Sequence, residues 1–128
     1  MIAQTIYKST SGEAMSLVNI SQVQGRVPVT IFQMQDRIHL GNFAELEATA
    51  KEAFDNGMRN LVIDLSKIAS LTSIAIRAIV IIHKMLSPDD SKHLKIAGST
   101  LIRELLDIAG VTQYIEVYNT VDEAVASF

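Results

Sequence analysis

Two adjacent hydroxyl residues, Thr72 and Ser73, stand where the sequence predicts the start of an apolar helix over residues 73–86. A strand-like run, Leu61–Ser66, precedes them, followed by the short segment 67–71. Backbone N–H groups in the first turn of a helix lack partners within the helix, and negative charge is favoured there. A hydroxyl at this place therefore caps the helix, at a gain of about 1 kcal/mol, or accepts a phosphate group, and the two roles are compatible.

The predicted helix has one wholly apolar face and one mixed face. The apolar face suits a protein core and consists of Ala75, Ala78, Ile79, Ile82 and Leu86. The mixed face consists of Ile74, Arg77, Ile81 and Lys84, spaced 3, 4 and 3 residues apart. Because the two cations mark this face as exposed, we expect a contact patch for a partner or for a second copy of the chain. The alternative is that loops cover Ile74 and Ile81, or that they are scattered surface residues.

The other titratable groups give no candidate catalytic or metal centre. His39, His83 and His93 lack the spacing of metal ligands, so we expect them at the surface or snorkelling towards it. Asp64 closes an apolar strand; we expect it to accept hydrogen bonds from the following loop, and the alternative is a buried functional carboxylate. There is no cysteine, no Ser/His/Asp order and no glycine-rich phosphate loop. The sequence therefore predicts no enzyme, no metal and no cofactor.

Charge and hydropathy exclude further classes of protein. With 128 residues, the chain is long enough for one domain with a real core. A net charge of −3, without any Lys/Arg cluster, argues against nucleic-acid binding. The longest apolar run, Ala78–Ile82, is far too short to span a membrane, and no signal-peptide pattern opens the chain. We expect a cytoplasmic protein that binds neither nucleic acid nor membrane.

The elements that must position these residues alternate along the chain. Residues 1–16 show no sustained periodicity and are expected to be an N-terminal extension of a domain that covers 17–128. Apolar patterns predict strands at 18–23, 27–34, 60–65, 94–97 and 115–118. Helices are predicted at 43–55, 73–86, 101–109 and 121–128, the last with a capping box of Thr120 and Glu123. This order predicts an α/β domain, a mixed β-sheet with helices packed on it.

The segment around Ser73 resembles the signature of the STAS domain of bacterial anti-sigma factor antagonists, which reads roughly D-L-S-x-V-x-x-[IM]-D-S-S-G-L-G. The matching residues are Asp64, Leu65, Ser66, Ile68, Leu71 and Ser73. The segment Leu105–Val111 resembles a later l-l-x-l-x-G-l segment of the family, and Val29–Ile38 is weakly similar to its v-x-v-l-x-l-x-G-x-l segment. The resemblance implies a single STAS-like domain.

The resemblance also implies a signalling role. The unphosphorylated domain would bind an anti-sigma factor with serine-kinase activity and free a sigma factor. That kinase, using ATP, would phosphorylate Ser73, with Thr72 as the alternative acceptor, and so break the complex; a serine phosphatase would reset it. The expected partner-binding residues are Ile74, Arg77, Ile81 and Lys84, with Asp36 and His39 on a neighbouring loop.

The residues beside Ser73 depart from the signature. Thr72 replaces an aspartate, Ile74 replaces the second serine, and glycines are replaced by Ala75 and Arg77. These departures favour an alternative, a constitutive STAS scaffold or homo-oligomeric assembly module without regulatory phosphorylation. A third hypothesis is a small-ligand carrier or enzyme on an α/β scaffold.

Overall fold

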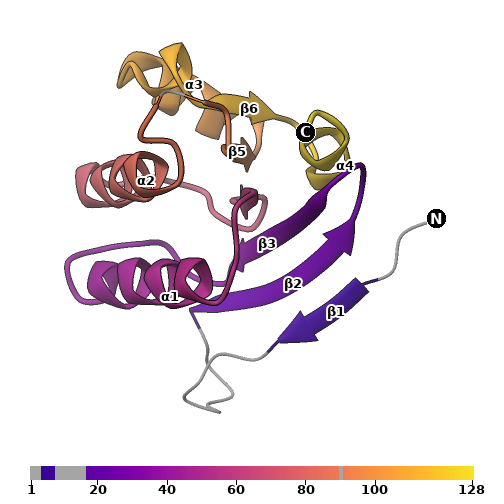
Figure 1. The fold of residues 1–128 in the computed structure, drawn as a ribbon. Coiled ribbons are helices and arrows are strands. Elements are labelled where there is room, and N and C mark those ends of the chain that lie inside the picture. Colours follow the sequence, from indigo (N-terminus) through magenta and orange to yellow (C-terminus); the bar gives the residue numbers. More distant parts are fainter. Residues whose placement is uncertain (1–3, 8–16, 90) are drawn as a thin grey trace.

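The residues that the structure describes form one six-stranded sheet with helices on both of its faces (Figure 1). The computed structural model describes residues 4–7, 17–89 and 91–128. The strands are β1 (Gln4–Tyr7), β2 (Val18–Gln24), β3 (Pro28–Met34), β4 (Leu61–Asp64), β5 (Leu94–Ala97) and β6 (Glu116–Tyr118). The helices are α1 (Phe43–Asp55), α2 (Ser73–Leu86), α3 (Thr100–Ile108) and α4 (Val121–Ala126), and a single 3-10 turn, η1 (Val111–Gln113), follows α3.

The sheet is mixed, as the sequence predicts. Strands β1, β2 and β3 are joined as antiparallel neighbours, whereas β3, β4, β5 and β6 are parallel. Their order across the sheet is the same as their order in the chain. In this register Val62 of β4 lies between Ile31 of β3 and Lys95 of β5, so these three residues share one face of the sheet.

Each face of the sheet has its own hydrophobic core. Helices α1, α2 and α3 cover one face, where Leu46, Ile79 and Ile102 pack with strand residues such as Phe32 and Ile63. Helix α4 covers part of the other face, seen apart from the other helices in Figure 1, and brings Ala124 and Val125 against the strands. All four residues of β4 are buried because this strand is covered on both sides, as its continuous apolar run predicts.

The edge strand β1 lies within residues 1–16, which the sequence pattern predicts to be an N-terminal extension. It pairs antiparallel with β2, from Gln4 opposite Val23 to Tyr7 opposite Ile20. Residues 1–3 and 8–16 of that extension lie outside the described residues, and the boundary at residue 16 remains a prediction. The predicted helices are all present, with ends shifted by at most two residues: α3 begins at Thr100 and α4 ends at Ala126.

Candidate functional site

The Thr72 hydroxyl is fully engaged in holding the structure together. It is the N-cap of α2, and its Oγ1 accepts a hydrogen bond of 3.0 Å from the N–H of Ala75. The same hydroxyl donates to the carbonyl oxygen of Ile38 at 2.8 Å. One side chain therefore satisfies an orphan N–H of the helix and also fixes the loop between β3 and α1 to the start of α2.

Ser73 is in the opposite situation. It is the first residue of α2 and is exposed. Its hydroxyl makes no hydrogen bond to any other residue that the structure describes. The two neighbouring hydroxyls thus have separate roles: Thr72 caps the helix, and Ser73 presents a free oxygen at the positive end of the helix dipole.

The loop between β3 and α1 is ordered by its own side chains. Asn42 accepts from the N–H of His39 at 2.8 Å and donates to the carbonyl of Arg37 at 3.0 Å. The Nδ1 of His39 accepts from the N–H of Gly41 at 3.0 Å, and the exposed Asp36 accepts from the N–H of Arg37. Through the bond of Ile38 to Thr72, this loop lies against the start of α2, so Asp36 and His39 belong to the same region of the surface as Ser73.

The mixed face of α2 is exposed in the way that its residue pattern predicts. Arg77 and Lys84 are exposed, Ile81 retains 40% of its accessible surface, and Ile74 is half-buried. Neither cation forms an ion pair with any described residue. Lys84 is 11 residues beyond Ser73, or roughly 16 Å along the helix, so the face extends well beyond the hydroxyl. Contact of these residues with a partner remains a prediction.

Asp64 is only 4% exposed, and its Oδ1 accepts from the N–H of Ser66 at 2.9 Å. The next residue, Leu65, donates its N–H to the carbonyl of Ala97 at 2.7 Å. Both bonds fix the chain where it leaves β4 and begins the loop that leads to Ser73. The interpretation of Asp64 as an acceptor for the following loop is therefore confirmed.

The prediction for the histidines is wrong for His83. His39 and His93 are half-buried, and the Nδ1 of His93 lies 2.9 Å from the Oδ1 of Asn60. His83 is 4% exposed, and its ring lies 5.3 Å from that of Tyr114, the residue that follows η1. The described residues contain no group of three His, Cys, Asp or Glu side chains that could hold a metal ion.

Several exposed apolar residues near these elements were not singled out from the sequence. Leu40 in the β3–α1 loop retains 73% of its accessible surface, and on α3 Leu101 retains 52% and Ile108 84%. In α3 the buried residues are Ile102 and Leu106. The sequence feature that could have identified Leu40 is its position as a single leucine in a loop, between His39 and Gly41. No periodic apolar pattern there predicts that its side chain is buried.

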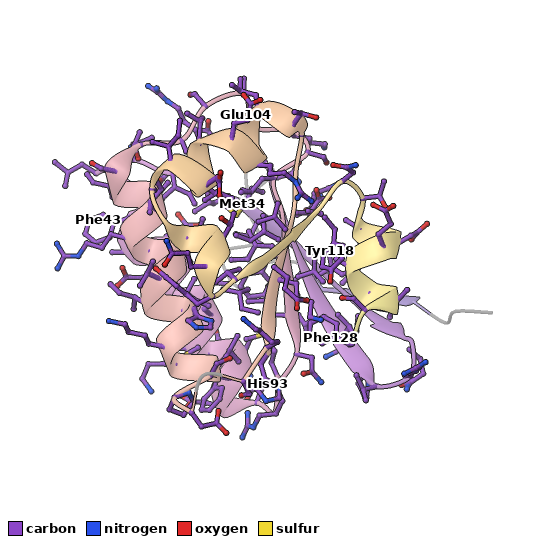
Figure 2. The ribbon with its side chains drawn as sticks, turned by 90° about the horizontal axis from the view of Figure 1, so that it is seen from above. Met34, Phe43, His93, Glu104, Tyr118 and Phe128 are labelled. Carbon is purple, nitrogen blue, oxygen red and sulfur yellow. The ribbon has the colours of Figure 1, made fainter. Side chains whose placement is uncertain are left out.

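A second charged cluster lies on the opposite face of the sheet. Lys95 is 4% exposed, and its Nζ lies 3.0 Å from Oε1 of Glu116. The same Nζ donates to the carbonyl and hydroxyl oxygens of Ser127, at 3.0 and 2.9 Å, and lies 4.5 Å from the ring centre of Phe128. Tyr118 and Phe128 mark this region in Figure 2. The cluster fastens the chain after α4 to strand β5.

The pKa of the Glu116 carboxyl is lowered in this cluster. The main cause is the hydrogen bond that the Tyr118 hydroxyl donates to Oε1, at 2.7 Å, and the bond from Lys95 adds to it. Glu116 is partly exposed, so water screens its charge. The carboxylate therefore remains ionised opposite the buried Lys95 ammonium.

Comparison with known proteins gives one consistent result. The family model of the STAS domain matches residues 20–124. This chain is 25% identical to BtrV of Bordetella bronchiseptica, which is named as an inferred anti-sigma factor antagonist. The match extends over 95 residues, which are 74% of this chain and 82% of BtrV.

Solved structures share the fold. A Thermotoga maritima protein, also named as an inferred anti-sigma factor antagonist, superimposes with a TM-score of 0.70 at 18% identity, over 77% of this chain and 86% of that one. An anti-sigma factor antagonist from Mycobacterium paratuberculosis gives a TM-score of 0.68 at 16% identity, over 99% of this chain and 93% of that one. In the described part of this chain, no helix has both the length and the apolar character needed to cross a membrane.

Proposed function

Since this chain belongs to the STAS domain family, we propose that it is an anti-sigma factor antagonist switched by phosphorylation of Ser73. Unphosphorylated, it binds a cytoplasmic anti-sigma factor that has serine-kinase activity, and this releases a sigma factor. The kinase transfers a phosphoryl group from ATP to the Ser73 hydroxyl, which breaks the complex, and a serine phosphatase restores the binding form. The observation that carries the proposal is the division of roles between Thr72 and Ser73 at the start of α2.

The geometry favours Ser73 over Thr72 as the acceptor. The Ser73 hydroxyl is exposed and makes no bond to any described residue, whereas a phosphate on Thr72 requires the loss of the bonds to Ala75 and Ile38. A phosphate adds a charge of about −1.5 to −2, and near a helix N-terminus this charge interacts favourably with the dipole. The domain therefore tolerates the modification, and its cost falls on a partner that must desolvate the charge.

The partner surface proposed here is the mixed face of α2 with the adjoining loop. Ile74 and Ile81 supply apolar contact, and Arg77 and Lys84 supply positive charge that no described residue neutralises. Asp36 and His39 contribute from the loop that Thr72 holds in place. The chemistry suits a partner surface that is apolar at its centre and acidic at its rim.

Mass spectrometry after incubation with the cognate kinase and ATP tests the phosphorylation. We expect one phosphate on Ser73 and none on Ser73→Ala, whereas Thr72→Val remains a substrate and Ser70→Ala, an exposed loop control, behaves as wild type. A phosphate that persists in Ser73→Ala would show that the acceptor lies elsewhere.

Calorimetric titration tests the consequence for binding. At fixed salt, Ser73→Asp should bind the anti-sigma partner tens to thousands of times more weakly than wild type, because an unpaired interfacial charge costs about 2–5 kcal/mol. Equal affinities would favour the alternative function, a constitutive STAS scaffold. That alternative has its own support in the bulky neighbours of Ser73, since Ile74 and Arg77 stand where the signature has a serine and a glycine.

A further inference from the structure

The start of α2 carries positive potential that no acidic side chain of the helix balances. The positive end of the helix dipole lies there, and the first turn of α2 contains no acidic residue. By contrast, α1 has Glu45 in its first turn, and α4 has Asp122 and Glu123. Helix α2 as a whole contains neither Asp nor Glu. An anion at this end of α2 would therefore meet a favourable potential that no carboxylate of the helix already uses.

Arg77 adds a second positive group close to Ser73. The two residues are four positions apart in α2, and residues at this spacing are neighbours on a helix surface, with Cβ atoms roughly 5–6 Å apart. Helical side chains lean towards the N-terminus, which directs Arg77 over the turn that begins with Ser73. Both residues are exposed, and Arg77 has no ion-pair partner among the residues that the structure describes. A negative group on Ser73 would therefore be the nearest anion to Arg77 along the helix.

We propose that Arg77 binds the phosphate group on Ser73 and so forms part of the switch. The inference rests on the proposed function, because it concerns the phosphorylated form of Ser73. A guanidinium group donates parallel N–H bonds to two phosphate oxygens, and the spacing of four residues brings the two groups within reach of each other. The phosphate then interacts with the N-terminus of α2 and with Arg77 at the same time.

This pairing gives Arg77 a different role in each form of the protein. In the unmodified chain its charge is free to contact the anti-sigma partner, and in the phosphorylated chain the phosphate occupies it. Phosphorylation then weakens the complex in two ways, because it adds negative charge to the partner surface and withdraws one of its two cations. Lys84, roughly 16 Å further along the helix, keeps its charge in both forms.

The pairing is a property of this sequence and not of the signature that it resembles. The signature has a glycine where this chain has Arg77, and glycine has no side chain that could bind a phosphate. The departure from the signature that places a bulky residue near Ser73 thus also supplies a phosphate ligand one helical turn away.

Phosphorus NMR of the whole chain with phosphoserine at position 73 tests the pairing. The phosphoserine is incorporated during synthesis through a reassigned codon, so the measurement needs neither the kinase nor the anti-sigma factor. The second pKa of a phosphoserine is ordinarily about 6. A neighbouring cation favours the doubly charged phosphate, so this pKa should be higher by roughly 0.5 in Arg77→Gln than in the chain that retains Arg77.

Lys84→Gln is the matched control, because it removes the same charge from the same face at a greater distance. Its phosphate should titrate as in the chain with both cations. Arg77→Lys keeps the charge without the two parallel bonds and should give an intermediate pKa. Circular dichroism confirms that each variant is folded.

Two results would overturn the proposal: a phosphate pKa that is the same with and without Arg77, or an equal change in Arg77→Gln and Lys84→Gln. Modification of Ser73 by the kinase is measured in a separate experiment. Failure of the pairing therefore leaves the proposed function intact, and failure of the kinase to modify Ser73 leaves the titration interpretable.

Discussion

The two faces of the sheet treat positive charge in opposite ways. On the α4 side, Lys95 is buried and has a carboxylate, two oxygens of Ser127 and the ring of Phe128 within reach. On the α2 side, Arg77 and Lys84 are exposed and have no ion-pair partner among the described residues. Charge that is satisfied within the chain stabilises the fold, whereas charge that is left unsatisfied at the surface is available to another molecule. The neighbouring hydroxyls of Thr72 and Ser73 show the same contrast: the first is hydrogen-bonded within the chain, and the second makes no hydrogen bond to any described residue.

The largest expected effect tests the buried side of this comparison. Lys95→Ala should lower the free energy of unfolding by about 3 kcal/mol, because it removes a buried cation and leaves its oxygen partners without their donor. The matched control, Lys84→Ala, should change it by less than about 0.5 kcal/mol. Urea unfolding of both variants measures the difference. Equal losses would mean that the Lys95 cluster contributes no more to the fold than a surface lysine.

A smaller effect separates the two hydroxyls. Thr72→Ala should cost about 1–2 kcal/mol of unfolding free energy, because α2 loses its cap and the carbonyl of Ile38 loses its donor. Ser73→Ala should stay within about 0.5 kcal/mol of wild type. Thermal and urea unfolding of the pair give the values. If Ser73→Ala proves the more damaging of the two, the roles assigned to these residues are reversed.

The exposed side is tested at Ile81. Ile81→Asp should cost about 1 kcal/mol or less in stability and should weaken binding to the anti-sigma partner, because position 81 lies on the exposed face. Ile79→Asp, on the buried face of the same helix, should cost several kcal/mol because it leaves an unpaired charge in the core. A comparable collapse of Ile81→Asp in thermal unfolding would place Ile81 in the core and remove it from the proposed contact surface.

The smallest effect concerns pH. The Tyr118 hydroxyl and Lys95 lower the pKa of Glu116 from its ordinary value of 4.5. A lowered folded-state pKa means that the carboxylate contributes stability that is fully present above about 4.5 and is lost as the pH falls through the folded-state value. Glu116→Gln should therefore lose less stability on acidification than wild type. Urea unfolding at a series of pH values measures this, and identical acid profiles would show that Glu116 plays no part in it.

Much of the fold could be predicted from the sequence because local patterns agree with the global structure. The buried run at β4, the hydroxyl before α2 and the Thr120 cap before α4 are all encoded within a few residues. The glycine that ends α3 is equally local: Gly110 has a φ of 81°, which favours glycine. The family resemblance then identified the order of these elements as a STAS domain, and the comparisons confirm it.

The failed prediction for His83, and the features for which the sequence made no prediction, depend on contacts between distant residues. His83 has the sequence context of a helix end near water, but Tyr114, 31 residues later, lies against its ring. Lys95 lies in a short apolar run, and its hydrogen-bond acceptor is in the chain after α4, too far along the sequence for a local pattern to predict. In α3 two apolar stripes interleave, and only packing shows that Ile102 and Leu106 are buried while Leu101 and Ile108 remain exposed. The sequence also could not show which of the two hydroxyls is hydrogen-bonded to the rest of the chain, because the acceptor, Ile38, is 34 residues from Thr72.

The order of the strands also bears on how the domain is assembled during synthesis. Each strand from β2 to β6 pairs with the strand that precedes it in the chain. A nascent chain can therefore extend the sheet at one growing edge, and no strand has to insert between two that are already paired. The β2–β3 hairpin closes at low entropic cost, whereas each parallel pair joins positions that are a whole strand–helix unit apart, such as Thr30 with Leu61 and Leu61 with Leu94. This topology therefore favours stepwise assembly, in which the hairpin forms first and each parallel strand is added after the helix that precedes it.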